Sequence, residues 1–346
     1  MDSEKFTKSD SEKENSMPNL SINMALLAEQ IEPYIKRTSN ANVVKATSDF
    51  AGIYNIGNGK LLVSTAGSVG AKLKLAFVLN RHNSIGIDCV AMCINNVISF
   101  GATPLFFQHY IATGKVYPDK ISQIMSGLSD GCVDSACAML GGEISELTGM
   151  YKPDEYELAG FALGIVDEDK IIDSSKVAAG DVLVGLASNG VHANGFSMIR
   201  QLFSIDAVAL SHYVDALGTN LGEELLKPSR IYASSILSLV KRFEINGIAH
   251  VTRGGLSGSI PRMLPPKLGV RLGINSWPIL PVYELIRAAN KTPMSELFNV
   301  FNMGIGMVMI VPKNSADAVV RCARELGENA YIIGDVVAEE GVQILE

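Results

Sequence analysis

Residues 181–196 read DVLVGLASNGVHANGF, and this stretch says more about the architecture than any other. Its apolar run, 181–187, is typical of a buried strand, the small-residue loop 188–195 follows, and a helix is predicted to begin at Phe196. A strand, a glycine-rich turn and a helix start form the usual arrangement for holding an anion on free backbone N–H groups. The stretch therefore predicts an α/β unit that binds a phosphate-type ligand.

Strand and helix patterns alternate irregularly around this unit. Helices are predicted over 20–37, 87–99, 119–138, 232–243 and 315–326, and strands over 60–64, 105–112, 139–143, 161–166, 304–311 and 331–336. A second small-residue loop, 65–72, follows the strand 60–64, and Gly57–Lys60 is predicted to be a hairpin turn. This mixture predicts an α+β or mixed α/β protein and not a regular doubly wound sheet.

Length and composition favour two domains with their own cores. The chain has 346 residues, of which 47% are hydrophobic and only 19% are charged. We expect a disordered tail over 1–19, rich in Ser, Lys and acids, an N-terminal domain over 20–176 and a C-terminal domain over 177–346. The tail has no apolar segment of the kind that a secretory signal requires.

Charge and hydropathy narrow the class of partner. The net charge is −7 and no basic stripe is present, so we expect no nucleic-acid partner. The longest apolar stretch, 303–311, is about half of what a membrane-spanning helix needs, so we expect no membrane partner and a cytoplasmic protein. The five cysteines form no CxxC pair and have apolar neighbours, which predicts buried free thiols. A small phosphorylated molecule remains the favoured ligand.

Thirteen short motifs, in register along the chain, resemble one known family. They are KLKLA (72–76), IGID (85–88), VAMCIN (90–95), GATPLFF (101–107), ATGK (112–115), GGE (141–143), GMY (149–151), AGF (159–161), HANG (192–195), PSRIY (228–232), AHVT (249–252), FNMGIGM (301–307) and GENA (327–330). Together they resemble aminoimidazole ribonucleotide synthetase, the phosphoribosylformylglycinamidine cyclo-ligase family. The resemblance extends from about residue 20 to the C-terminus.

The resemblance implies an activity and an architecture. Members of this family use ATP to close the imidazole ring of formylglycinamidine ribonucleotide in de novo purine synthesis, with Mg²⁺ held by carboxylates. Their N-terminal half forms a β-barrel with its twin in a homodimer, and their C-terminal half is α/β. The resemblance therefore implies an ATP-dependent ligase with ATP and Mg²⁺ as cofactors.

The resemblance also implies roles for individual residues. It assigns Gly70, Lys72, Asp88, Asn95 and Asn96 to ATP, and Glu143 to the metal. It assigns His192, Asn194, Gly195, Arg230, His250 and Thr252 to the phosphorylated substrate, with His192 and Lys72 as catalytic residues. Simpler alternatives stay open: Lys72 as an ordinary loop lysine, Asp88 and Glu143 as helix caps, and His250 as a core histidine.

Several positions depart from the family pattern on the ATP side. Gly67 stands where the family has Asp, and Asn96 replaces a second acid. Ala66 and Ala71 replace hydroxyl residues, Ile144 replaces Thr, and Arg253 replaces Gly. Because Mg²⁺ prefers carboxylate oxygen, these changes predict weakened metal binding. They leave two alternatives open: a catalytically impaired homologue that binds ligand or acts as a partner subunit, and a related ATP-using dimer with another substrate.

Overall fold

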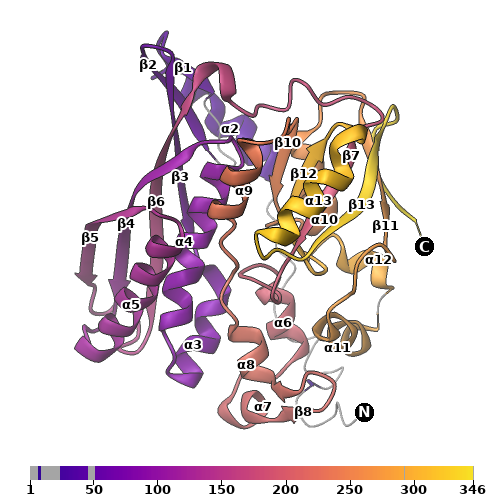
Figure 1. Ribbon diagram of the computed structural model, residues 1–346. Helices are drawn as coiled ribbons and strands as arrows, with labels where there is room; N and C mark the ends of the chain where they lie inside the picture. The colour runs from indigo at the N-terminus through magenta and orange to yellow at the C-terminus, as the bar shows by residue number, and fades with distance from the viewer. Residues whose placement is uncertain (1–6, 9–23, 46–50, 292, 346) are drawn as a thin grey trace.

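Two six-stranded sheets, one from each half of the chain, lie side by side in the structure (Figure 1). The structure is a computed structural model that describes residues 7–8, 24–45, 51–291 and 293–345. Both sheets are mixed and helices pack against them, so the predicted mixed α/β class is confirmed.

The first sheet is built from six strands of the N-terminal half. In spatial order they are β1 (Val43–Lys45), β2 (Gly52–Gly57), β3 (Lys60–Ser68), β6 (Tyr156–Asp167), β4 (Thr103–Thr113) and β5 (Ala138–Glu146). All neighbours are antiparallel except β4 and β5. The predicted hairpin turn is confirmed between β2 and β3, where Asn58 and Gly59 both have positive φ, as a tight hairpin turn requires.

Three helices of the N-terminal half follow β3 and the strands next to it. They are α3 (Leu73–Leu79), α4 (Asn83–Ile98) and α5 (Pro118–Asp134). Helix α4 is buried along almost its whole length and contacts β3, β6 and α5. Glycine is required at the contact with α5, because a Cβ on Gly127 would lie 1.7 Å from the Asn83 carbonyl oxygen. This close packing holds α5 against α4.

The second sheet contains six strands of the C-terminal half. In spatial order they are β10 (Gly247–His250), β12 (Ile305–Val311), β7 (Val182–Ala187), β13 (Ala330–Val337), β11 (Gly269–Gly273) and β14 (Gly341–Leu345). All seven residues of β12 are buried, because this strand lies inside the sheet between β10 and β7. Its uninterrupted apolar sequence is the pattern of a strand covered on both faces.

Short helices complete the chain. They are α2 (Met24–Lys36), α6 (Phe196–Leu202), α7 (Ala207–Ser211), α8 (Leu221–Leu226), α9 (Ala233–Val240), α10 (Gly255–Ser259), α11 (Pro281–Asn290), α12 (Met294–Leu297) and α13 (Ala316–Glu325). Helix α9 contacts both α4 and α13, so it joins the two halves (Figure 1). Two 3-10 turns, η2 (Gly70–Lys72) and η4 (Ile260–Met263), lie at the junction described below.

Element boundaries differ from the predictions where pairing extends a strand. The predicted loop 65–72 is wrong over 65–68, because β3 continues to Ser68, which pairs with Ala159 of β6. Within the predicted tail 1–19, Thr7 pairs with Phe203, and the other positions except Lys8 lie outside the described residues. All five cysteines are buried and free, as predicted. Within the described residues, no helix combines the length and apolar character needed to cross a bilayer.

Candidate ligand-binding cleft

A cleft of about 520 Å³ lies where the two halves of the chain meet. The end of β3 and the turn η2 form one wall, and residues 193–197, Thr252 and Arg253 line it from the C-terminal half. Five of the residues that the sequence singled out lie on this cleft: Gly70, Asn96, Asn194, Gly195 and Thr252. Residues more than 180 positions apart in the sequence thus share one cavity, as a site between two domains requires.

Glycine positions shape both walls of the cleft. Gly70 has a φ of +71° and Gly195 a φ of +83°, a region that side chains with a Cβ rarely adopt. A Cβ on Gly195 would also lie 2.2 Å from the ring of Phe301. The loop that precedes α6 is therefore held against the core by Phe301, and Asn194 is placed at the cleft.

Polar groups along the cleft suit an anion. The Thr252 side chain is buried and its Oγ1 has no hydrogen-bond partner. Arg253 and Arg262 line the same cavity, and an Arg262 Nη donates to the Arg253 carbonyl oxygen at 2.7 Å. Among the described residues that line the cleft, none is Asp or Glu. The lining is thus positive and rich in donors.

Lys72 lies behind the cleft in a closed polar network. Its side chain is fully buried, and Nζ lies 2.7 Å from Asp88 Oδ2 and donates to the Lys227 carbonyl oxygen at 2.6 Å. Burial lowers the pKa of Lys72, and the Asp88 carboxylate opposes this effect. Asp88 Oδ1 also accepts from the Ser229 N–H at 2.7 Å and from Ser229 Oγ at 2.6 Å. In this structure the network ties α3 and α4 to the segment after α8.

The contacts of Asp88 and Lys72 test the two simpler interpretations of these residues, a helix cap and an ordinary loop lysine. Asp88 lies inside α4, which begins at Asn83, so its interpretation as a helix cap is wrong. Lys72 is not an ordinary loop lysine, because its amine is buried against a carboxylate. Neither side chain lines the cleft, and the predicted contacts of Lys72 and Asp88 with ATP stay predictions.

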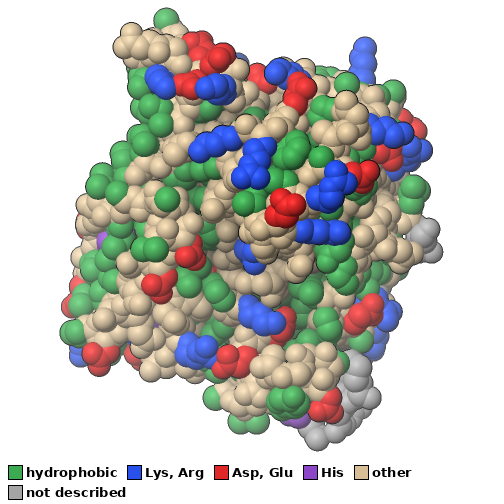
Figure 2. All heavy atoms as spheres, viewed as in Figure 1, with side chains coloured by type: hydrophobic (Ala, Val, Ile, Leu, Met, Phe, Trp, Pro, Cys, Tyr) green, Lys and Arg blue, Asp and Glu red, His purple; other side chains and the backbone are tan. Residues whose placement is uncertain are grey.

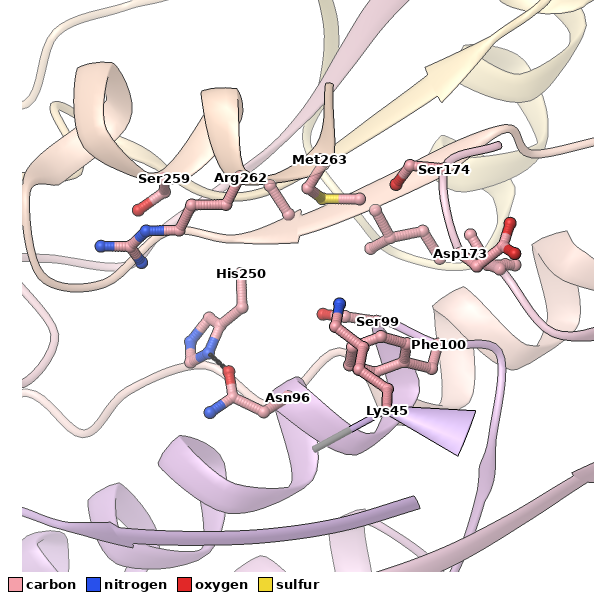
Figure 3. Close-up of a pocket in the computed structure, with 13 residues that line it drawn as sticks. Lys45, Asn96, Ser99, Phe100, Asp173, Ser174, His250, Ser259, Arg262 and Met263 are labelled. Atoms are coloured by element: carbon pink, nitrogen blue, oxygen red, sulfur yellow. Dashed lines mark hydrogen bonds between the residues drawn. The ribbon is translucent and has the colours of Figure 1, made fainter. Parts of the chain in front are cut away.

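Asn95 and Asn96 connect α4 to the C-terminal half. Asn95 Nδ2 donates to the Arg230 carbonyl oxygen at 2.9 Å, and its Oδ1 accepts from the Tyr232 N–H at 3.1 Å. His250 Nδ1 donates to Asn96 Oδ1 at 2.8 Å, since a carbonyl oxygen can only accept (Figure 3). Burial lowers the pKa of His250 to about 3, so its ring is neutral at physiological pH.

A smaller cavity of about 90 Å³ adjoins this contact (Figure 3). Asn96 and Arg262 line both cavities, and Lys45 and Asp173 line only the smaller one. In Figure 3 the Arg262 guanidinium points away from Asp173. The Arg262 charge is therefore directed away from the acid of the smaller cavity.

His192 and Arg230 are not among the residues that line the cleft. His192 is buried with a φ of +62°, and its Nε2 accepts from the Arg230 N–H at 3.4 Å while Nδ1 has no partner. Burial, followed by the charges of His250, Lys72 and Arg230, lowers the pKa of His192. The Arg230 side chain donates to Glu328 at 2.8 Å. Their predicted substrate contacts stay predictions.

Glu143 lies apart from the other predicted residues. It is exposed on β5, the edge strand of the first sheet, and accepts from Ser145 Oγ at 2.6 Å. Because it sits within a strand, its interpretation as a helix cap is wrong. Over the described part of the chain, no cluster of three His, Cys, Asp or Glu side chains could hold a metal. The residues described along the cleft include none of the carboxylates that Mg²⁺ prefers, so these residues do not fit this ion.

Sequence reasoning missed some residues of this junction. Arg262, Ser68 and Ser197 line the cleft, and Lys227 and Ser229 anchor the Lys72 network. Ser229 belongs to the motif PSRIY, which could have identified the segment. No local signal marks Arg262, because it reaches the cleft through the fold of η4.

Comparison with known proteins identifies the family. Residues 48–166 match the family described as AIR synthase related protein, N-terminal domain, and residues 178–345 match its C-terminal domain. The chain is 48% identical over 315 residues to phosphoribosylformylglycinamidine cyclo-ligase of Acetivibrio thermocellus, covering 90% of this chain and 93% of the relative. It is 46% identical over 317 residues to the protein of the same name from Geobacillus kaustophilus, covering 90% of this chain and 92% of the relative.

Solved structures share the fold at lower identity. Thiamine-monophosphate kinase from Stenotrophomonas maltophilia superposes with a TM-score of 0.65 at 17% identity, covering 92% of this chain and 95% of that one. T. maritima PurL complexed with AMPPCP gives a TM-score of 0.60 at 14% identity, covering 91% of this chain and 45% of that one. The chain belongs to the phosphoribosylformylglycinamidine cyclo-ligase family.

Proposed function

We infer that this chain is an ATP-dependent ligase that closes the imidazole ring of formylglycinamidine ribonucleotide, forming aminoimidazole ribonucleotide in purine synthesis. The identity of 48% over 93% of a relative with that name carries the inference. The cleft between the halves supports it, because an anionic ligand suits its donors and its two arginines. Such a reaction on small phosphorylated intermediates is consistent with a cytoplasmic enzyme.

The reaction joins two steps on one substrate atom. The γ-phosphoryl group of ATP passes to the formyl oxygen, and ADP leaves. The amidine nitrogen then attacks the activated formyl carbon, the C–O bond breaks, and orthophosphate carries away the oxygen. The chain has to hold two anionic ligands, keep water from the activated carbon, and align the nitrogen with that carbon.

The predicted site residues divide into two groups by position. We assign direct ligand contact to those on the cleft: Gly70, Asn96, Asn194, Gly195 and Thr252. The Lys72–Asp88 pair, the Asn95 and His250 contacts and the His192–Arg230 contact position these walls from behind. The neutral His250 ring holds Asn96 by a hydrogen bond, so the Asn96 amide is oriented before ligand arrives.

We also propose that the chain forms a homodimer through the first sheet. Helix α4 covers one face of this sheet, and the apolar side chains of Tyr110 and Phe161, which the strand register places together on the other face, are exposed. An exposed apolar sheet surface of this kind marks an interface. Figure 2 shows acidic and basic side chains interspersed on the viewed face, without one continuous basic field. Light scattering of Phe161→Glu should report a monomer where the native chain reports a dimer.

Measurement of ADP release tests the activity. The purified chain is mixed with formylglycinamidine ribonucleotide, ATP and Mg²⁺, and substrate-dependent ADP is followed. Asn194→Ala should lower the rate at least tenfold, because Asn194 lines the cleft, whereas the exposed Asn299→Ala should not change it. A folded chain that releases no ADP above background would refute the ligase assignment. That result would favour the alternative of a catalytically impaired homologue. The relatives, which are named as cyclo-ligases, do not support this alternative.

A further inference from the structure

We propose that Asn302 is a positioning residue for the ligand: its buried amide holds the loop 188–195 against the core and so sets Asn194 and Gly195 at the cleft. This role deepens the proposed function and rests on it for the identity of the substrate. It concerns how one wall of the cleft is held before ligand binds, and the position of that wall can also be measured without turnover.

The Asn302 side chain is buried, and both ends of its amide make hydrogen bonds. Nδ2 donates to the Gly190 carbonyl oxygen at 3.0 Å, inside the loop. Oδ1 accepts from Ser188 Oγ at 3.0 Å and from the Gly304 N–H at 2.8 Å. An amide offers a donor and an acceptor on one planar group, so it can join two segments in one fixed geometry. The Asn302 amide thus ties the start of the loop to the turn that precedes β12.

Two aromatic residues complete the support under the loop. The Tyr283 hydroxyl, on α11, donates to Asn302 Oδ1 at 2.6 Å. The Tyr283 ring is fully buried, and its centroid lies 5.9 Å from that of the Phe301 ring. Phe301 in turn fills the space that a Cβ on Gly195 would need. The segment 301–304 therefore supports the loop at its start through Asn302 and at its end through Phe301.

The shape of this loop depends on that support. The backbone at His192 has a φ of +62°, a region that a residue with a Cβ adopts only where its surroundings fix it. When a ligand binds only the ordered loop, its apparent affinity falls in proportion to the fraction of chains with an ordered loop. A saturating ligand restores that fraction. Loss of the Asn302 contacts should therefore weaken binding and leave the rate at saturation nearly unchanged.

Steady-state kinetics with formylglycinamidine ribonucleotide test this division on the full chain. Asn302→Ala removes the whole amide and should raise KM for this substrate at least about fivefold, with kcat within about threefold of the native value. A simple loss of folded protein would lower kcat and leave KM unchanged. Asn246→Ala is the matched control, because this buried asparagine contacts Asp181 at the other end of β12 and should leave KM unchanged.

Hydrogen exchange measures the loop in the absence of any ligand. The Ser188 N–H donates to the Gly304 carbonyl oxygen at 2.8 Å, so its exchange rate reports opening of the loop. Tyr283→Phe removes one donor to Asn302 at nearly constant shape and should speed this exchange about three- to tenfold, the factor expected for one neutral hydrogen bond. Tyr156→Phe is the matched control, because this buried tyrosine is hydrogen-bonded within the N-terminal half and should leave the exchange unchanged.

Circular dichroism confirms that each variant is folded, and Tyr283→Phe carries the test if Asn302→Ala does not fold. Three results would overturn the role of Asn302. They are an unchanged KM in folded Asn302→Ala, an equal rise of KM in Asn246→Ala, and exchange at Ser188 that Tyr283→Phe does not accelerate. Accelerated exchange in Tyr283→Phe, with a native chain that does not turn over formylglycinamidine ribonucleotide, would support the positioning role and refute the proposed catalysis alone.

Discussion

Two groups of positive charge lie at the same junction and differ in their surroundings. The Lys72 ammonium is fully buried, 2.7 Å from Asp88 Oδ2, and its other contact is a backbone carbonyl oxygen. Arg253 and Arg262 are exposed side chains that line the cleft, and an Arg262 Nη donates to the Arg253 carbonyl oxygen at 2.7 Å. A buried cation requires its counter-ion within the protein, whereas an exposed cation is solvated by water and does not depend on a protein carboxylate. Burial, more than residue type, therefore decides how strongly a charge is tied to the fold.

Removal of the buried counter-ion should have the largest effect. Asp88→Ala leaves the Lys72 ammonium without its carboxylate and removes two hydrogen bonds from Ser229. We expect the free energy of unfolding to fall by about 3–5 kcal/mol. Denaturant unfolding followed by circular dichroism measures the change.

An exposed ion pair gives the matched control for this loss. Lys74 pairs with Glu155 at 2.7 Å, and both side chains are partly exposed. Glu155→Ala should therefore cost at most about 1 kcal/mol. Equal losses in the two variants would contradict the distinction between buried and exposed charge.

Acidification should give the next largest effect, through two other buried groups, the rings of His250 and His82. Burial lowers the pKa of His250 to about 3 and that of His82 to about 4, so the unfolded chain binds protons at higher pH than the folded chain does. The free energy of unfolding should then fall as pH drops below about 6.5, by about 1.5 kcal/mol for each such histidine at pH 5. His250→Gln should show a shallower fall, and an unchanged slope would refute this account of His250.

The boundary between the two regions passes through Asn96. Its Oδ1 accepts from the buried His250 ring, and its side chain also lines the cleft. In Asn96→Asp the new carboxylate should raise the pKa of His250 by about one unit or more. NMR titration of the histidine ring protons measures this pKa. A pKa that stays near 3 would mean that Asn96 does not contact His250 in solution.

The smallest effect is expected at Thr252. Because its buried Oγ1 has no partner, Thr252→Val removes an unpaired hydroxyl at constant shape and should leave the free energy of unfolding within about 0.5 kcal/mol. Affinity for formylglycinamidine ribonucleotide should fall about three- to tenfold if this hydroxyl contacts the ligand. Calorimetry and thermal unfolding of the same sample separate the two quantities, and a clear loss of stability without a loss of affinity would assign Thr252 to the fold.

The sequence predicted elements best where one local pattern persists. The run 304–311 was predicted as a strand and is found as β12 over Ile305–Val311, because its continuous apolar pattern reflects burial on both faces. The prediction that a helix begins at Phe196 is confirmed. The loop 65–72 was predicted too long, because its last strand residues are held by pairing with β6, which lies about 90 positions later.

Side-chain direction could not be predicted in the same way. Of the residues assigned to ligands, Asn194 and Thr252 line the cleft, whereas His192 turns inward although it belongs to the same motif as Asn194. The positive φ of His192 and the contact of Gly195 with Phe301 set these directions. Neither the positive φ of His192 nor the contact with Phe301 can be recognised from the four letters of the motif HANG (192–195).

By itself, the sequence determined the mixed α/β class, the glycine-rich turns and the family, because these depend on local periodicity and on short motifs in order. Only the tertiary structure decided which charges are buried and which face the cleft. Asp88, which pairs with Lys72, meets Ser229 across 141 sequence positions, and Arg262 reaches the cleft through η4. The physical reason is that burial and charge pairing depend on distances in space, which no local pattern encodes.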